Sequence, residues 1–128
     1  MDRTLDYTRL CRMMADNKWD FYTACCEVRR AGVYFLNFAL EELDLDKLLI
    51  LRENCLAVNA LYCQLDFRGN VSGRIALLLK MARLADVRQV IPELPEGDDP
   101  ELTAQNSAGL FRLQQALKEL GIDLLMPQ

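Results

Sequence analysis

Apolar side chains recur at helical spacing along nearly the whole chain, and this periodicity constrains the fold more than any other feature. The stretch "GNVSGRIALLLK", residues 69 to 80, leads into the most apolar run of the sequence. A segment from about 73 to 90 is apolar nearly all round in its first half, as a central, surrounded helix normally is. No stretch alternates convincingly between apolar and polar residues, as a half-buried strand would. The sequence therefore predicts an all-α fold.

The expected helices follow one another in a single domain, residues 1–128. Gly32 lies inside the second helix, at a cost of roughly 1 kcal/mol relative to alanine. Asp99 and Pro100 form a good N-cap and first-turn pair, and Gly121 is a typical end of a helix. The approximate ranges are 3–15, 18–40, 46–66, 73–90 and 100–120, with a linker at 91–101. We expect a compact bundle of about five to seven helices.

The residue types argue against catalysis. The chain has no histidine, which removes most metal sites, the usual triads and the commonest general acid or base. Glu41 and Glu42 are adjacent, so in a helix they point to different sides. The stretch "GNVSGR" lacks the spacing and the Lys-Ser/Thr pair of a phosphate loop. We expect a protein that is not an enzyme and that has no cofactor and no metal.

The net charge and the cysteines limit which partners and which cellular compartment we expect for this chain. The net charge is -4 and the basic residues form no stripe along the chain, which argues against nucleic acid as a partner. The five cysteines form no C-x-x-C pair, so we expect free thiols in a reducing compartment. No signal peptide and no membrane-spanning segment stand out, since Lys80 and Arg83 interrupt the longest apolar run. These features predict a cytoplasmic protein.

Arg74 stands at the start of the most apolar expected helix, where the helix dipole mildly disfavours a cation. One interpretation is an exposed arginine, or one that pairs with the nearby Asp66. The other is a receptor arginine at the rim of an apolar groove, where it binds a carboxylate of another protein.

Two motifs resemble those of the Bcl-2 family of apoptosis regulators. "FRGNVSGRIALLL" is similar to the family's first homology motif, and "ACCEVRRAGVYF" is similar to its third, the BH3 motif. Val71 and Ser72 stand where the first motif has Asn and Trp, and Val33 stands at the aspartate position of the third. The matching residues are Gly69, Gly73, Arg74 and Ile75 in the first motif, and Val28, Ala31, Gly32 and Phe35 in the third.

The resemblance implies a Bcl-2-like bundle and an inhibitor of apoptosis. The second homology motif and a C-terminal anchor are not found, so the chain looks like a short viral homologue, with an iridovirus as a candidate source. By the resemblance, a hydrophobic groove would sequester the BH3 helix of pro-apoptotic proteins, and Arg74 would pair with the ligand's aspartate. The implied groove residues are Arg74, Gly73, Phe35, Phe38, Ala39, Leu61, Leu65 and Leu77.

Three other interpretations stay open at the level of sequence. A helical adaptor could act through another surface, and a helix-turn-helix regulator is possible, although the acidic charge argues against it. The chain could also form a homodimer, because dimerisation would bury the exposed apolar surface of a groove. The protein would lie in the host cytoplasm, and whether partners recruit it to mitochondria stays open at the level of sequence.

Overall fold

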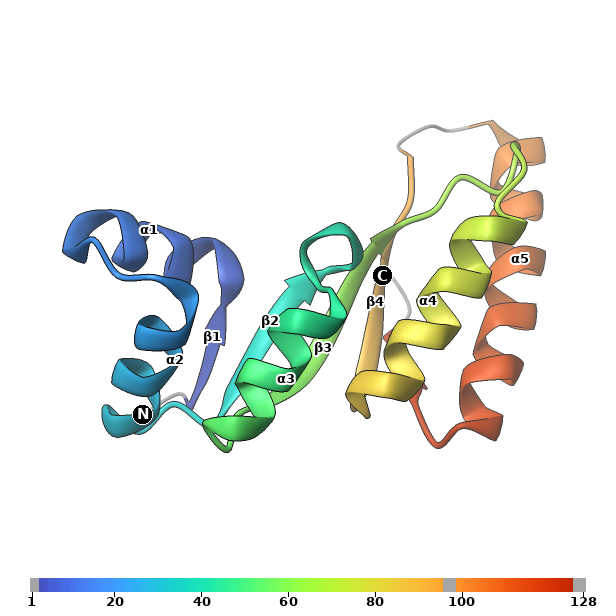
Figure 1. The fold of residues 1–128 in the computed structure, drawn as a ribbon. Helices are drawn as coiled ribbons and strands as arrows, with labels where there is room; N and C mark the ends of the chain where they lie inside the picture. The colour runs from blue at the N-terminus through green and yellow to red at the C-terminus, as the bar shows by residue number, and fades with distance from the viewer. Residues whose placement is uncertain (1–2, 96–98, 126–128) are drawn as a thin grey trace.

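The computed structural model describes residues 3–95 and 99–125 and shows an α/β protein built on a five-stranded sheet (Figure 1). The strands lie in chain order, β1-β2-β3-β4-β5, and every neighbouring pair is parallel. The elements are β1 (Thr4–Asp6), α1 (Tyr7–Asn17), α2 (Phe21–Arg30), β2 (Phe35–Ala39), the 3-10 turn η1 (Leu40–Glu42), α3 (Leu45–Glu53), β3 (Ala57–Gln64), α4 (Ser72–Ala85), β4 (Gln89–Glu93), α5 (Pro100–Glu119) and β5 (Asp123–Leu124). The predicted all-α bundle is therefore wrong.

The predicted long helices end early, at residues with a left-handed backbone. The expected helix 18–40 ends at Arg30, and Gly32 then adopts φ 100°, which glycine tolerates at little cost. The expected helix 46–66 ends at Glu53, and Cys55 turns the chain with φ 58°. In both places the rest of the expected helix is a strand, β2 and β3.

These strands alternate in burial but not in residue type, because apolar residues such as Phe35, Ala39 and Ile91 lie on the half-buried open face as well. Strands of parallel sheets are often buried on both faces and are then nearly continuous apolar runs, which periodicity alone does not distinguish from a buried helix. In β3 the run Ala60–Leu61 is buried, and a register shift opposite Leu36 and Asn37 interrupts the alternation further. The predicted linker 91–101 contains the last three residues of β4.

The last helix agrees with its prediction. Asp99 caps α5 by accepting a hydrogen bond from the backbone N–H of Glu101 (3.0 Å), and Pro100 is the first helical residue. After the helix, Gly121 has φ 75°, the left-handed conformation expected where a helix ends. In the described part of the chain, no helix is long and apolar enough to cross a membrane.

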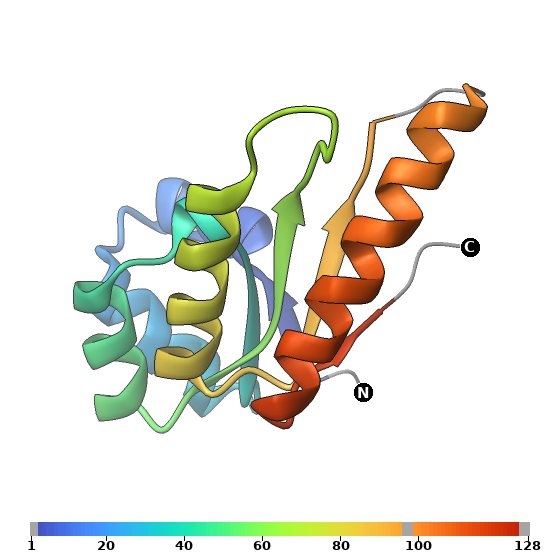
Figure 2. The same ribbon diagram turned by 90° about the vertical axis from the view of Figure 1, so that its right-hand side faces the viewer.

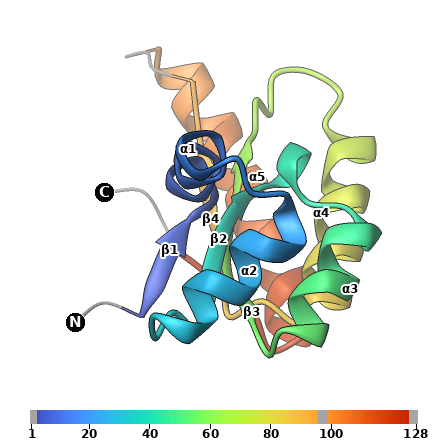
Figure 3. The same ribbon diagram turned by 60° about the vertical axis from the view of Figure 1, so that its left-hand side comes forward.

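Helices cover one face of the sheet and leave the other open. In Figure 1, α2, α3 and α4 succeed one another along the sheet in chain order, as right-handed parallel crossovers require. Figure 3, in which the left-hand side of Figure 1 comes forward, shows α2 and α3 beside β2 and β3. The core forms between these layers; its largest fully buried strand residues are Leu36, Phe38, Leu61 and Val90. Residues of the opposite orientation lie on what we call the open face: Thr4, Asp6, Phe35, Asn37, Ala39, Ala57, Tyr62, Gln89, Ile91 and Glu93, each half-buried or exposed.

Candidate functional site

Polar side chains gather on the open face at the edge where the parallel strands end. Asp6 is the last residue of β1, Glu93 is the last of β4, and Asn37 and Tyr62 each lie two residues before the end of a strand. Because all strands are parallel, their carboxyl ends meet at one edge, which is the upper edge in Figure 2. We call Asp6, Asn37, Tyr62 and Glu93 the carboxyl-edge cluster. Ligand sites of parallel α/β proteins lie at this edge.

Two hydrogen bonds connect Asp6 and Asn37 of the cluster to β3. The Asn37 side chain donates from Nδ2 to Oδ1 of Asp6 (3.0 Å). Its own oxygen accepts from Nδ2 of Asn59 (3.3 Å), the additional β3 residue at the register shift. The amide of Asn37 is thus fixed from both sides, and it holds the Asp6 carboxylate in place at the carboxyl edge.

The cluster lines a hollow of about 450 Å³. This volume lies in the range of sites for small molecules, about 300–1,000 Å³. Its further lining residues are Tyr7, Thr8, Ala39, Glu42 and Ile91. The site therefore combines carboxylates, an amide and hydroxyls with a few apolar walls, a donor and acceptor set suited to a polyhydroxylated ligand.

Both tyrosines of the hollow are held in the protonated form. Partial burial, followed by the negative charges of Asp6 and Glu93, raises the pKa of the Tyr62 phenol. Burial, followed by a hydrogen bond with Cys11, raises the pKa of Tyr7 to about 12. At neutral pH each phenol therefore carries its proton, and negatively charged carboxylates act on both of them, Asp6 and Glu93 on Tyr62 and Glu42 on Tyr7.

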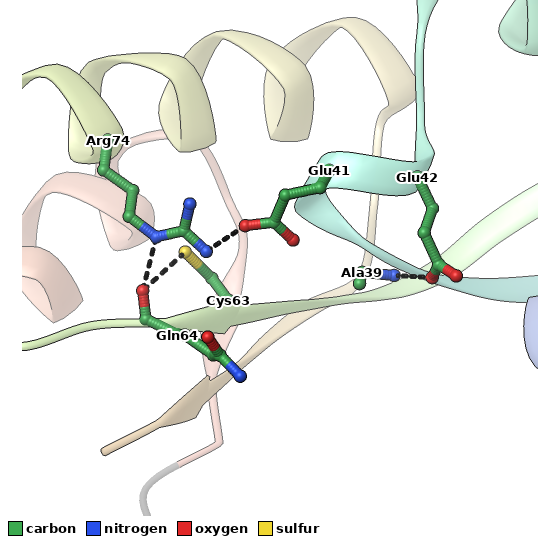
Figure 4. A network of polar contacts seen from close by, with 6 residues as sticks. All are labelled: Ala39, Glu41, Glu42, Cys63, Gln64 and Arg74. Atoms are coloured by element: carbon green, nitrogen blue, oxygen red, sulfur yellow. Dashed lines mark hydrogen bonds and ion pairs between the residues drawn. The ribbon is translucent and has the colours of Figure 1, made fainter. Parts of the chain in front are cut away.

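Arg74 lies at the same edge and has its ion-pair partner within this chain (Figure 4). Its Nη2 donates to Oε1 of Glu41, and its Nε donates to the backbone oxygen of Gln64, the last residue of β3. Hydrogen bonding by the backbone of Glu41 and then by Arg74 lowers the pKa of the Glu41 carboxyl. The alternative partner considered from the sequence, Asp66, pairs instead with Arg68 (2.8 Å). Arg74 is thus not an unpaired receptor for a foreign carboxylate.

A second hollow, of about 610 Å³, adjoins Arg74. The loop that follows β3 forms one wall of it through Gly69 and Asn70, and Glu93 lies in its lining as it does in that of the first hollow. The carboxyl edge is therefore indented along β3 and β4, with Glu93 between the two hollows. Among the described residues, no group of three or more histidine, cysteine, aspartate or glutamate side chains is placed to hold a metal ion.

The residues of the implied groove do not line one surface. Phe38, Leu61 and Leu65 are buried in the core. Phe35 and Ala39 point to the open face, on the opposite side of the sheet. Gly73 and Leu77 lie on α4, where Leu77 is 46% exposed and a side chain at position 73 would meet nothing within 4 Å. No groove between helices brings these eight residues together, because a sheet separates them.

No member of the carboxyl-edge cluster was predicted from the sequence. Asp6 and Tyr62 fell inside expected helices, and Glu93 fell in the expected linker. A signal was nevertheless present, since Asn37 interrupts a short apolar run and Glu93 follows one, as polar residues at strand ends do. These positions are recognised as strand ends only once the parallel strands are known.

Searches with protein-family models and among curated proteins give no match for this chain. A solved structure does match: a sugar phosphate isomerase/epimerase from Parabacteroides distasonis, with a TM-score of 0.71 and 13% sequence identity. The match covers 94% of the present chain and 49% of that protein. The two chains share a fold. The present chain spans about half the length of the protein it matches.

This likeness overturns the Bcl-2 resemblance together with what followed from it. A Bcl-2-like protein is a helical bundle, whereas the matched fold and this one are parallel α/β. The roles of apoptosis inhibitor, viral homologue and BH3 receptor depended on the two helical motifs. "ACCEVRRAGVYF" is here the end of α2 and the start of β2, and "FRGNVSGRIALLL" is a loop followed by α4, so neither motif has its implied setting.

Proposed function

We propose that this chain contributes the carbohydrate-binding edge of an isomerase or epimerase that acts on a sugar or sugar phosphate. The observation that carries the proposal is the carboxyl-edge cluster, with Asp6 held by Asn37, in its hollow of about 450 Å³. The fold shared with a sugar phosphate isomerase/epimerase supports the reaction class. The proposal replaces the expectation of a protein without enzymatic activity.

The reaction requires a base on one side of a hydroxy-carbonyl group and a hydrogen-bond donor on the other side. A carboxylate, Asp6 or Glu93, removes the proton from the carbon next to the carbonyl, and the electron pair moves to the carbonyl oxygen as an enediolate. Tyr62, protonated at neutral pH, donates a hydrogen bond to that oxygen. For isomerisation, the proton of the neighbouring hydroxyl passes to that oxygen and the carbon-bound proton returns to the former carbonyl carbon. For epimerisation, the proton returns to the opposite face of the carbon that it left. Atoms and charge balance without a further reactant.

A phosphorylated ligand has a place for its phosphate next to the cluster. A hollow of about 410 Å³ adjoins the first one and shares Asp6 and Thr8 with it. Arg9 and Arg12 of α1 line it, and among the described residues no ion pair engages either guanidinium within 4.0 Å. Arginine binds phosphate oxygens well because its planar N–H groups match their geometry. The phosphate of a sugar bound at the cluster would lie toward these arginines.

Proton exchange with solvent tests the reaction. The protein is incubated in D₂O with a set of aldoses, ketoses and their phosphates, and proton NMR follows both product formation and loss of the signal next to the carbonyl. Asp6→Asn and Glu93→Gln are the site variants. Glu119→Gln, an exposed acid at the end of α5, is the matched control.

We expect turnover that falls by about 10²–10⁴ in the variant of the catalytic base and is unchanged in Glu119→Gln. Absence of exchange and of product with every sugar would overturn the reaction. Turnover that survives both Asp6→Asn and Glu93→Gln would overturn the site.

A further inference from the structure

The open face of the sheet carries apolar surface that the described residues leave partly uncovered. Phe35, Tyr62 and Ile91 lie on it half-buried, and Ala57 lies on it exposed. Parallel sheets occur almost only with both faces covered, because their strands present apolar side chains on each side. Here the helices cover one face alone.

The borders of the sheet are also unfinished. Within the described residues, β1 pairs only with β2, and β5 pairs only with β4. An edge strand presents unpaired N–H and C=O groups that favour pairing with another chain. Both edges border the same open face, so one partner placed on that face reaches all of the unfinished surface.

The size of the matched structure indicates how much polypeptide such a cover requires. The aligned part is 49% of that protein, which therefore contains about as much chain again. A second copy of this chain supplies 128 further residues, a comparable amount. Twofold contact also places identical surfaces together, so the half-buried apolar residues of one copy meet those of the other.

We propose that the open face is an interface with a second copy of this chain. The contact buries Phe35, Ala57 and Ile91, and it leaves the outer surfaces of the helices in solvent. Because the carboxyl-edge cluster lies on the same face, the partner copy also closes the hollow from the side that is now open. The interface does not depend on the proposed reaction, and it can be measured without any sugar.

Sedimentation velocity over a range of concentrations, from about 1 to about 100 μM, tests the interface, since dimer formation follows mass action. The open-face variants are Ile91→Asp and Ala57→Arg. Ala57 is exposed at the start of β3, so we expect Ala57→Arg to remain folded. This variant tests the interface even where Ile91→Asp unfolds the protein. Leu77→Asp, on the outer side of α4 with 46% of the residue exposed, is the matched control. Circular dichroism verifies that each variant is folded.

We expect the wild-type chain to pass from monomer to dimer with concentration. Each folded open-face variant should weaken dimerisation at least tenfold, whereas Leu77→Asp should not. A wild-type chain that is monomeric throughout the range would overturn the proposal. So would a dimer that resists both Ile91→Asp and Ala57→Arg, or one that only Leu77→Asp disrupts, because the contact would then lie elsewhere.

Discussion

Arg74 shows how the setting of a side chain decides its role. On the sequence alone it was a cation at the mouth of an apolar helix, and a partner outside the chain was one interpretation. In the structure it joins the end of β3 to the turn after β2, through the Gln64 carbonyl and the Glu41 carboxylate. Its partner lies 33 residues away in sequence, so no local pattern reveals the pair. The arginine supports the carboxyl edge on which the candidate site is built.

A double-mutant cycle measures this pair. Arg74→Met and Glu41→Gln, alone and together, should show a coupling free energy of about 0.5 kcal/mol by chemical denaturation, because both side chains are partly exposed. Arg83→Met, an exposed residue in the last turn of the same helix, should change stability by less than about 0.5 kcal/mol. A coupling energy indistinguishable from zero would mean that solvent screens the pair.

Tyr7 gives the protein a pH dependence in the alkaline range. Its pKa is about 12 in the folded chain against an ordinary 10.0, so the folded state binds the phenolic proton more tightly. This contribution to stability is fully present below the unfolded pKa and is lost as pH rises from there toward the folded pKa. Below a pH of about 9, the unfolding free energies of the wild type and of Tyr7→Phe should therefore vary with pH with similar slopes. Above a pH of about 10, the unfolding free energy should fall less steeply with pH in Tyr7→Phe than in the wild type.

Tyr22→Phe is the control for this titration, because Tyr22 is 48% exposed. It should follow the wild-type profile throughout. Equal alkaline slopes in the wild type and in Tyr7→Phe would show that the Tyr7 phenol does not contribute.

At the scale of elements, the sequence predicts features that depend on adjacent residues, such as helix caps. It misleads about features that depend on tertiary contacts, such as strands. The caps of α5 were predicted at Asp99, Pro100 and Gly121, because capping depends on a few adjacent residues. The strands β2 and β3 were missed because their apolar runs fit a buried helix as well as a strand in a parallel sheet. Only pairing with distant strands distinguishes the two, and a single sequence does not show it. The candidate site was missed with them, since its residues meet only when the strands align.

Two glycines test the packing of α4 and α5. A side chain at Gly109, in α5, would overlap the ring of Phe67 from the loop after β3, whereas one at Gly73, in α4, meets open space. Gly109→Ala should destabilise the protein by about 1–3 kcal/mol through overpacking. Gly73→Ala should stabilise it by up to about 1 kcal/mol through helix propensity and a less flexible unfolded chain.

Thermal and chemical denaturation of the two variants measure this difference directly. Each is the other's control, because both place the same methyl group in a helix. A Gly109→Ala variant as stable as Gly73→Ala would contradict the packing of Phe67 against α5.

At the scale of the whole molecule, the proposed function depends on the asymmetry of a sheet that the described helices cover on one face only. The covered face supplies the core, and the open face supplies the carboxyl-edge cluster and the proposed interface. Neither the polar cluster nor the open apolar surface belongs to one continuous stretch of sequence. Both arise from consecutive parallel strands that bring Asp6, Asn37, Tyr62 and Glu93 to one edge.

The most direct test of this account is an NMR titration of the isotope-labelled, backbone-assigned protein with a ketose and with its phosphate ester. We predict saturable amide shifts centred on Asp6, Asn37, Tyr62 and Glu93 for both ligands. The phosphate ester should add shifts at Arg9 and Arg12, and Asp6→Asn should weaken binding of both ligands. Absence of any saturable shift at millimolar ligand, or shifts confined to the outer helices, would contradict a sugar site at the carboxyl edge of the sheet.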